Sequence, residues 1–182
     1  MPESHPAKHP VLYVIVCAAP PAQSIHEFIE RAQKVGWDVC VIATPIATRF
    51  IDVPRLTALT GHIVRSDYKL PGEADPLPRA DAIVTLPATF NTINKLAGGI
   101  ADTLATSILC EALGRDAPPI VLVPCLKMDL IRHPAFARSI EVLRGCGVRI
   151  LHEPERYPSP LMVPWDEIID ALPQVRQGGA RM

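Results

Sequence analysis

The stretch from Leu86 to Leu104, LPATFNTINKLAGGIADTL, constrains the fold more than any other part of this 182-residue chain. The apolar run Ala82–Leu86 leads into it, and a small, hydroxyl-rich turn follows over Pro87–Thr92. A buried strand that ends in a polar turn before a helix is the arrangement with which α/β sheets bind ligands. The stretch therefore predicts an α/β sheet with a ligand site at the end of one strand.

Short apolar runs recur along the chain, and segments with helical periodicity separate them. Crossovers of this length are typical of a parallel, doubly wound sheet between two helical layers. We therefore expect one three-layer α/β domain over residues 11–173, Rossmann-like or flavodoxin-like, with disordered tails at 1–10 and 174–182. The predicted strands are Val11–Val16, Asp38–Ala43, Gly61–Ser66, Ala82–Leu86, Ile120–Val123 and Val148–Leu151. The predicted helices are Ile25–Val35, Ile51–Leu59, Ile93–Leu113, Phe136–Gly145 and Trp165–Leu172.

Two local patterns bear on the helices. Ser24 is expected to cap the first helix, with Glu27 at the third position as in a capping box. The pair Gly98 and Gly99 falls inside the predicted long helix, where each glycine costs about 1 kcal/mol of helix propensity. Glycines kept in a helix usually let another backbone approach, so we expect a tight contact there.

Composition excludes several classes of protein. The net charge of −1 offers no basic field for nucleic acid. The longest apolar runs, Val11–Ala19 and Ile120–Val123, are too short to span a bilayer, and residues 1–10 lack the apolar stretch of a secretory signal. The five cysteines are scattered without a CxxC pair, and they show no metal-ligand spacing with the six histidines. We therefore expect a cytoplasmic protein with reduced cysteines and no metal, nucleic-acid or membrane partner.

The polar turns after the strands belong to one region. The carboxyl ends of parallel strands lie at the same edge, so turns 17–24, 44–48, 87–92 and 124–129 are expected to meet there. Three of these turns carry Ser or Thr hydroxyls, which with free amides suit a phosphate group. The chain has neither GxGxxG nor GxxxxGK[ST], so a mononucleotide is the expected guest. The alternative is that these hydroxyls only cap helices.

The segment Pro87–Thr92 followed by Asn94–Leu104 resembles the motif of the homo-oligomeric, flavin-containing cysteine decarboxylases. That family includes phosphopantothenoylcysteine decarboxylase and the enzymes that decarboxylate the C-terminal cysteine of lantibiotic precursor peptides. The resemblance implies an FMN cofactor, a homo-oligomer built of trimers or a dodecamer of trimers, and oxidative decarboxylation of a peptide C-terminal cysteine or a small cysteine conjugate.

The resemblance also implies roles for single residues. The expected cofactor-binding residues are Ser24 and Thr44 near the phosphate, Phe50 near the flavin, Thr89, Asn91 and Thr92 in the motif, and Asp102 at the flavin-facing interface. Asn91 matches the residue that grips the substrate carboxylate in the family, although an Asn there also suits a plain N-cap. Asp102 is equally compatible with a solvated helix acid.

The chain departs from the family pattern at three places. The family has a histidine fourteen residues before the motif, where this chain has Glu73; His62 lies eleven residues earlier. Glu73 and His62 are therefore the candidate bases, against a surface role for His62. Lys127 and Met128 are the candidate substrate-binding residues, with Lys127 where the family has Asn; a solvated loop lysine is the alternative. Residues 151–165 lack the family's glycine-rich flap and form either a different lid or a surface segment.

These departures leave two other functions open. The chain is compatible with another FMN-dependent redox or flavin-modifying enzyme, or with a non-catalytic FMN-binding subunit that assembles with a partner.

Overall fold

The computed structural model describes residues 9–174, which form a five-stranded parallel sheet in the order β2-β1-β3-β4-β5. The strands are β1 (Val11–Val16), β2 (Asp38–Ala43), β3 (Ala82–Ala88), β4 (Ile120–Pro124) and β5 (Arg149–Ile150). This is the flavodoxin-like, doubly wound order, in which the direction of winding reverses between β1 and β3. The predicted fold class is confirmed, while the predicted tails fall almost wholly outside the described residues.

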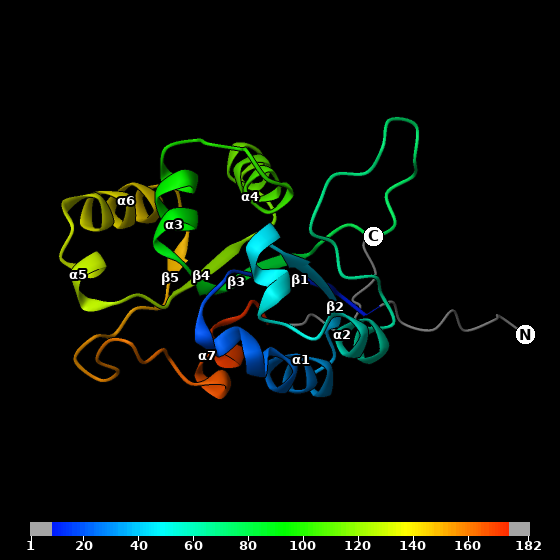
Figure 1. Ribbon diagram of the computed structural model, residues 1–182, viewed down its shortest axis with the longest axis horizontal. Coiled ribbons are helices and arrows are strands. Elements are labelled where there is room, and N and C mark those ends of the chain that lie inside the picture. Colours follow the sequence, from blue (N-terminus) through cyan, green and yellow to red (C-terminus); the bar gives the residue numbers. More distant parts are fainter. Residues whose placement is uncertain (1–8, 175–182) are drawn as a thin grey trace, which may run out of the picture.

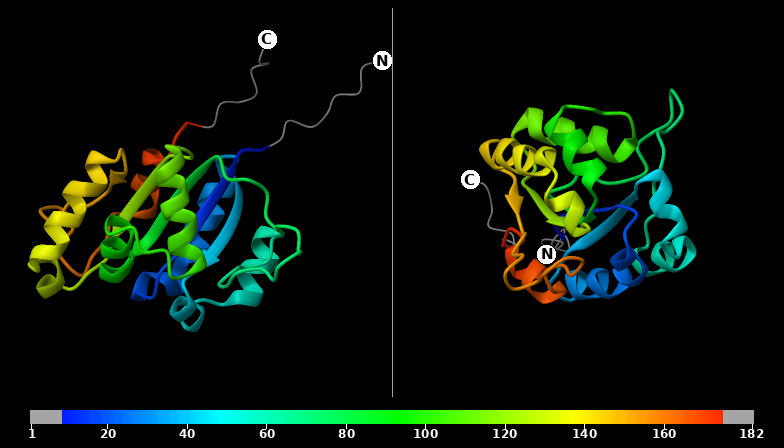
Figure 2. Two further views of the ribbon diagram at one scale, coloured as in Figure 1. Left: turned by 90° about the horizontal axis from the view of Figure 1, so that it is seen from above. Right: turned by 60° about the vertical axis from the view of Figure 1, so that its left-hand side comes forward.

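Helices cover both faces of the sheet and complete a three-layer structure (Figures 1 and 2). One layer contains α1, α2 and α7, and the other contains α3, α4 and α6. The helices are α1 (Ile25–Lys34), α2 (Val53–Thr60), α3 (Phe90–Ala97), α4 (Leu104–Arg115), α5 (Met128–Ile131), α6 (Pro134–Gly145) and α7 (Trp165–Ala171), with 3-10 turns η1 (Pro20–Ser24) and η2 (Pro45–Arg49).

The two faces of the sheet hold two hydrophobic cores. Along β1, Leu12 and Val14 pack with the α1 layer, while Val11 and Ile15 pack with the α4 layer. Strands that are buried on both faces are apolar at every position, whereas a half-exposed strand alternates. This double burial explains why the strands read as unbroken apolar runs in the sequence.

The long helix predicted over Ile93–Leu113 is wrong: the structure has two helices, α3 and α4, with a break between them. Gly99 adopts a left-handed conformation with φ +68°, which favours glycine. A new helix then begins after Thr103, whose side chain forms a reciprocal capping box with Thr106. The glycine pair therefore ends α3; it does not lie inside a continuous helix, where the sequence predicted a close contact with another backbone.

Two smaller predictions are also wrong. The expected strand Gly61–Ser66 is reduced to a single bridge between Arg65 and Ile42. Ser24 precedes α1 but makes no side-chain cap, because its Oγ donates to the carbonyl of Pro21 at 3.3 Å. The preceding 3-10 turn thus competes with the capping box that the sequence favours.

Three features concern partners and cofactors. Among residues 9–174, no helix is both long and apolar enough to cross a membrane. Within the same range, no group of three or more His, Cys, Asp or Glu side chains is placed to hold a metal ion. All five cysteines are free thiols.

Candidate functional site

A cavity of about 980 Å³ lies at the carboxyl edge of the sheet, where the segments that follow β1, β2, β3 and β4 meet. We call it the edge cavity. It is lined by Ala18, Ala19, Pro20, Thr44, Pro45, Ile46, Thr89, Phe90, Asn91, Thr92, Lys95, Thr103, Thr106, Cys125, Leu126, Lys127, Met128, Leu130, Ser159 and Pro160. Its position beside the ends of β1 and β3 is the switch point at which doubly wound sheets bind ligands.

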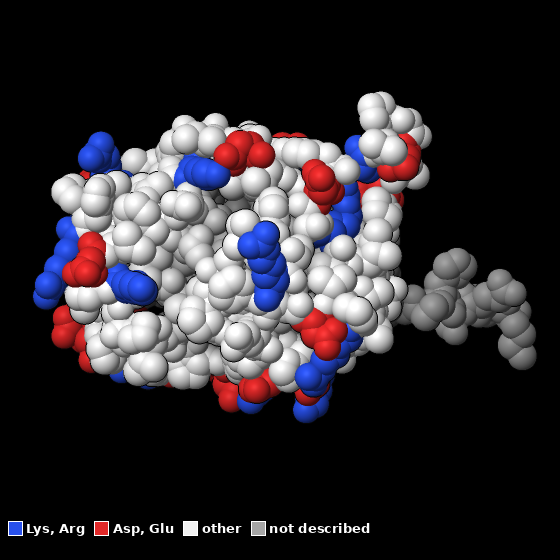
Figure 3. Space-filling model, viewed as in Figure 1, with Lys and Arg blue, Asp and Glu red and all other residues white. Residues whose placement is uncertain are grey.

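The walls of the edge cavity divide by chemistry. The segments after β1 and β4 contribute mainly apolar surface, whereas the segment after β3 and the start of α4 contribute hydroxyl and amide groups. The face viewed in Figure 3 is largely uncharged, with one Lys or Arg side chain near its middle and the other charged side chains of both signs towards its margins. An apolar slot with a few convergent polar groups is the usual form of a cofactor site.

A short hydrogen-bonded chain lies beneath the polar wall. The Cys17 thiol donates to Thr92 Oγ1 at 3.2 Å, and Thr92 Oγ1 lies 3.2 Å from Thr89 Oγ1. Burial raises the pKa of the Cys17 thiol, so this group stays protonated and acts as a donor. Either hydroxyl can be the donor in the bond between Thr92 and Thr89, so Thr89 Oγ1 can offer a ligand a donor or an acceptor.

The first helix turn after β3 adds backbone donors. Thr89 is the N-cap of α3, and its side chain makes no capping hydrogen bond. The first amides of a helix have no partner within the helix, so the amides that follow Thr89 remain available to a ligand. Hydroxyl and amide donors therefore converge on one side of the edge cavity.

Two lysines add positive charge to the cavity. Lys95 Nζ lies 2.6 Å from Asp102 Oδ2, and this hydrogen bond lowers the pKa of the Asp102 carboxyl. Lys127 is exposed and has no carboxylate partner within residues 9–174. Among the described residues, no Asp, Glu or His lines the cavity, so the site is selective for anionic groups.

The proline-rich segment after β5 closes one side of the cavity. Ser159 Oγ donates to the carbonyl of Leu126 at 2.5 Å, and the Cys125 thiol donates to the carbonyl of Pro160 at 3.5 Å. Ser159 and Pro160 both line the cavity, so this segment forms part of its wall.

Six of the predicted site residues line the edge cavity: Thr44, Thr89, Asn91, Thr92, Lys127 and Met128. Three others do not line it. Ser24 bonds to Pro21 in the turn before α1, Phe50 packs against the α1-side core, and Asp102 reaches the cavity only through Lys95.

Both candidate bases lie away from the cavity. His62 Nε2 is 2.7 Å from Oδ1 of Asp38, the first residue of β2 and thus at the opposite edge of the sheet. Glu73 is exposed in the loop before β3, where its carboxylate accepts from the amide of Leu70 at 2.9 Å. The expectation that one of them folds into the site is not met within this chain.

Among the residues that line the cavity, sequence reasoning missed four with hydroxyl or ammonium groups: Lys95, Thr103, Thr106 and Ser159. Thr103 and Thr106 have the spacing of a capping box, which marks the start of a helix, but this was overlooked because the sequence predicted one long helix through both residues. Lys95 lies four residues after Asn91, which places the two side chains on the same face of α3. Ser159 lies in a segment without a periodic pattern, so nothing in the sequence signalled it.

The flavodoxin-like order, the cavity at the switch point and the absence of a dinucleotide fingerprint define the class: a doubly wound α/β protein suited to a mononucleotide ligand. The family model described as Flavoprotein matches residues 2–177. The chain therefore belongs to the Flavoprotein family, and the resemblance inferred from the motif at Pro87 is confirmed.

Similar proteins agree with this assignment. The coenzyme A biosynthesis bifunctional protein CoaBC of Bacillus subtilis is 34% identical over 130 residues, which cover 68% of this chain and 31% of that protein. CoaBC of Thermococcus kodakarensis is 30% identical over 149 residues, covering 75% and 36%. The matched region thus spans about a third of these curated relatives.

Solved structures show the same fold. The FMN-dependent cysteine decarboxylase SpaF has a TM-score of 0.65 and 26% identity, with 80% of this chain and 84% of that chain covered. The epidermin biosynthesis protein EpiD from Staphylococcus aureus has a TM-score of 0.69 and 22% identity, with 89% and 99% covered. At that lower identity, the second likeness concerns the fold alone.

Proposed function

We propose that this chain binds FMN in the edge cavity and catalyses the oxidative decarboxylation of a cysteine-containing substrate. The substrate is the C-terminal cysteine of a peptide or a small cysteine conjugate. Membership of the Flavoprotein family and the likeness to SpaF, which its name describes as an FMN-dependent cysteine decarboxylase, support the proposal. The observation that carries it is the convergence of hydroxyls, free amides and apolar walls at the β1/β3 switch point.

The groups that line the edge cavity fit FMN. A flavin has a flat, largely apolar ring system and a polar tail that ends in a phosphate, so its site needs an apolar slot beside hydroxyl, amide and cationic groups. The edge cavity offers both halves, and Thr44, Thr89 and Thr92 would hold the polar parts. Bound FMN would supply an acceptor for the two electrons that leave the substrate.

The residues of the chain itself serve to bind and orient the substrate. Lys127 and the amide of Asn91 would hold the substrate carboxylate. The positive charge of Lys127, which has no carboxylate partner among the described residues, would lower the pKa of a bound substrate thiol and favour the thiolate, whereas Asp102 offsets the charge of Lys95. In the overall reaction the substrate would lose CO2 and two hydrogens, for which bound FMN would be the acceptor, and an enethiol would remain.

Cofactor binding is the first test. Purified protein is titrated with FMN while flavin fluorescence and melting temperature are followed; we expect quenching and an upward shift in melting temperature. The Thr89→Val variant should bind FMN about fivefold more weakly, since one lost hydrogen bond is worth about 1 kcal/mol. Thr57→Val, a matched control on α2 in the other helical layer, should bind normally. Unchanged fluorescence and melting temperature in the wild type would refute the flavin site.

Turnover is the second test. The FMN-loaded protein is incubated in air with peptides that end in cysteine, with matched peptides that end in serine, and with phosphopantothenoylcysteine. We expect a loss of about 46 mass units, CO2 plus two hydrogens, from a cysteine substrate only. Tight FMN binding with no mass change in either substrate class would overturn the decarboxylase proposal and favour the other flavin enzymes or a non-catalytic subunit.

We further propose that the chain assembles into a homo-oligomer through the break between α3 and α4. Gly98, Gly99 and Ala101 are exposed small residues next to the edge cavity, and Ile100 is 50% exposed there. Small residues let two backbones approach closely around such an apolar side chain. Light scattering tests the assembly, and a monomer at working concentration would contradict it.

A further inference from the structure

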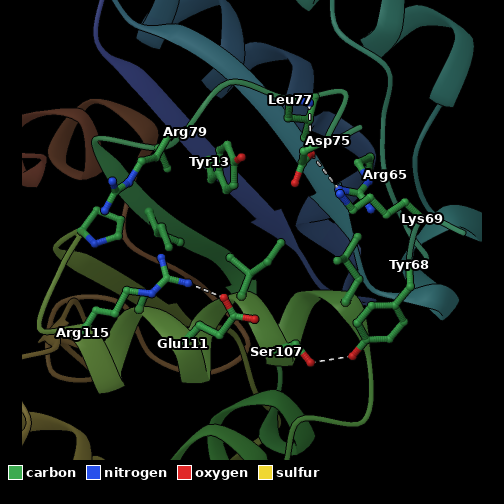
Figure 4. A pocket seen from close by; sticks show the side chains of 16 residues that line it. Tyr13, Arg65, Tyr68, Lys69, Asp75, Leu77, Arg79, Ser107, Glu111 and Arg115 are labelled. Carbon is green, nitrogen blue, oxygen red and sulfur yellow. Dashed lines mark hydrogen bonds and ion pairs between the residues drawn. The ribbon is translucent and has the colours of Figure 1, made fainter. Parts of the chain in front are cut away.

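A second cavity, of about 540 Å³, lies between α4 and the loop that leads into β3 (Figure 4). We call it the side cavity. It shares no lining residue with the edge cavity. Helix α4 separates the two, because Thr103 and Thr106 line the edge cavity whereas Ser107 and Glu111 line the side cavity. The proposed FMN chemistry therefore does not account for it.

The floor of the side cavity is apolar. Leu77, Ile83 and Ile108 contribute aliphatic surface, and Tyr13 lines the cavity with them. The Tyr13 hydroxyl donates to the carbonyl of Pro78 at 2.7 Å, and burial raises the pKa of Tyr13 to about 12. The phenol therefore stays neutral and adds no negative charge to the cavity.

Contacts between the loop and the helix keep the side cavity open. Tyr68 Oη lies 2.5 Å from Ser107 Oγ, which fastens the loop to α4. Arg65 Nη1 lies 3.1 Å from Asp75 Oδ1, which fastens the two ends of the loop to each other. The Arg65 side chain is only 9% exposed, so this second pair is held in place. A cavity with a fixed frame is a better ligand site than a gap under a loose loop.

The rim of the side cavity is basic. Its four cations are Arg65, Lys69, Arg79 and Arg115, and its two carboxylates are Asp75 and Glu111. The carboxylates pair with Arg65 and Arg115, whereas Lys69 and Arg79 make no ion pair within residues 9–174. A local excess of two positive charges in a chain of net charge −1 favours an anion at this opening.

We propose that the side cavity is a second ligand site, for an amphipathic organic anion: an apolar ring or chain that carries a carboxylate, phosphate or sulfonate group. The apolar part lies on the floor around Ile83 and Ile108. The anionic group lies at the part of the rim that carries Arg79 and Arg115, while Lys69 adds positive charge on the opposite side of the cavity (Figure 4). A hydrated inorganic anion would leave the apolar floor unused, and an organic cation would be repelled by the rim.

The test uses the FMN-saturated, full-length protein and equilibrium dialysis, which flavin absorption does not disturb. The probe is anilinonaphthalene sulfonate, and N-phenylnaphthylamine is its uncharged analogue. With the edge cavity filled by one equivalent of FMN, we expect one sulfonate probe per chain and an affinity at least about tenfold above that of the neutral analogue. Equal affinity for both probes, or loss of probe binding as that one equivalent of FMN fills the edge cavity, would overturn the proposal.

Variants locate the site. The exposed pair Lys69→Glu and Arg79→Glu should together weaken binding of the sulfonate probe by at least about tenfold. The control pair Lys34→Glu and Arg55→Glu makes the same change in net charge on exposed positions of α1 and α2 and should leave binding unchanged. Equal loss in both double variants would show a non-specific charge effect and refute the site. Absence of probe binding to the wild type would refute it as well.

Discussion

Two buried threonines near the end of β3 should respond in opposite ways to the same substitution. Thr85 is fully buried, and its Oγ1 has no hydrogen-bond partner within the described residues. An unsatisfied buried hydroxyl costs about 1–3 kcal/mol, and valine has nearly the same shape without the polar atom. Thr85→Val should therefore raise the free energy of unfolding by about 1 kcal/mol or more.

Thr92 is the contrasting case. It is 4% exposed, and its hydroxyl accepts from the Cys17 thiol at 3.2 Å and lies 3.2 Å from Thr89 Oγ1. Each such bond contributes about 0.5–1.5 kcal/mol net, with the thiol at the lower end. Thr92→Val should lower the free energy of unfolding by about 1–2 kcal/mol, because it removes both bonds while it keeps the packing volume.

Urea unfolding of the two variants and the wild type, followed by circular dichroism at one protein concentration, measures both effects. Without FMN, the midpoints should move in opposite directions at an unchanged m value. With saturating FMN the gap should widen, because Thr92 lines the edge cavity and Thr85 does not. If Thr85→Val lowers the midpoint as much as Thr92→Val, the Thr85 hydroxyl is satisfied and the reasoning is refuted.

Three further predictions concern charge. Lys127→Met should raise KM for a cysteine substrate about tenfold or more, with a smaller change in kcat, whereas Lys127→Arg should retain most of the affinity for the substrate. Steady-state kinetics of the two variants measures both constants. Lys95→Met should raise the pKa of the Asp102 carboxyl toward its ordinary value, which NMR titration of the carboxyl groups measures. The stability that the Lys95–Asp102 pair contributes is fully present above the ordinary pKa of an aspartate, and it is lost as the pH falls through the lowered pKa of Asp102. Burial lowers the pKa of His152 beside Phe136, so wild-type stability should decrease as pH falls below 6.5, and His152→Phe should weaken that dependence in denaturation at several pH values.

The sheet was predictable because both of its faces are buried. Apart from Asp38 at the start of β2, every residue of β1 and β2 is apolar or aromatic, and such runs stand out in the sequence. The stretch Gly61–Ser66 looked similar, but only Arg65 pairs with β2, because the loop is held instead by the Arg65–Asp75 ion pair and the Tyr68–Ser107 contact. Contacts between residues far apart in sequence leave no periodic trace.

The site was predictable where it depends on strand ends. Thr44, Thr89, Asn91 and Lys127 follow strands directly, so the rule that parallel strands end at one edge was enough to bring them together. Counting along a loop was not enough for Glu73, because the chain between α2 and β3 has no regular structure that fixes where a side chain ends up.

The glycine pair that misled the helix prediction is what assembles the polar side of the edge cavity. In one continuous helix, the axial distance from Asn91 to Thr103 would be about 18 Å, too far for both to line one wall. The left-handed turn at Gly99 ends α3 and lets a new helix begin at Thr103, while the Lys95–Asp102 ion pair ties the two helices across the break. Gly98 and Gly99 therefore interrupt the helix and bring the hydroxyls at the start of α4 to the ends of the strands. Without this interruption, the polar groups of α3 and α4 could not line the same cavity.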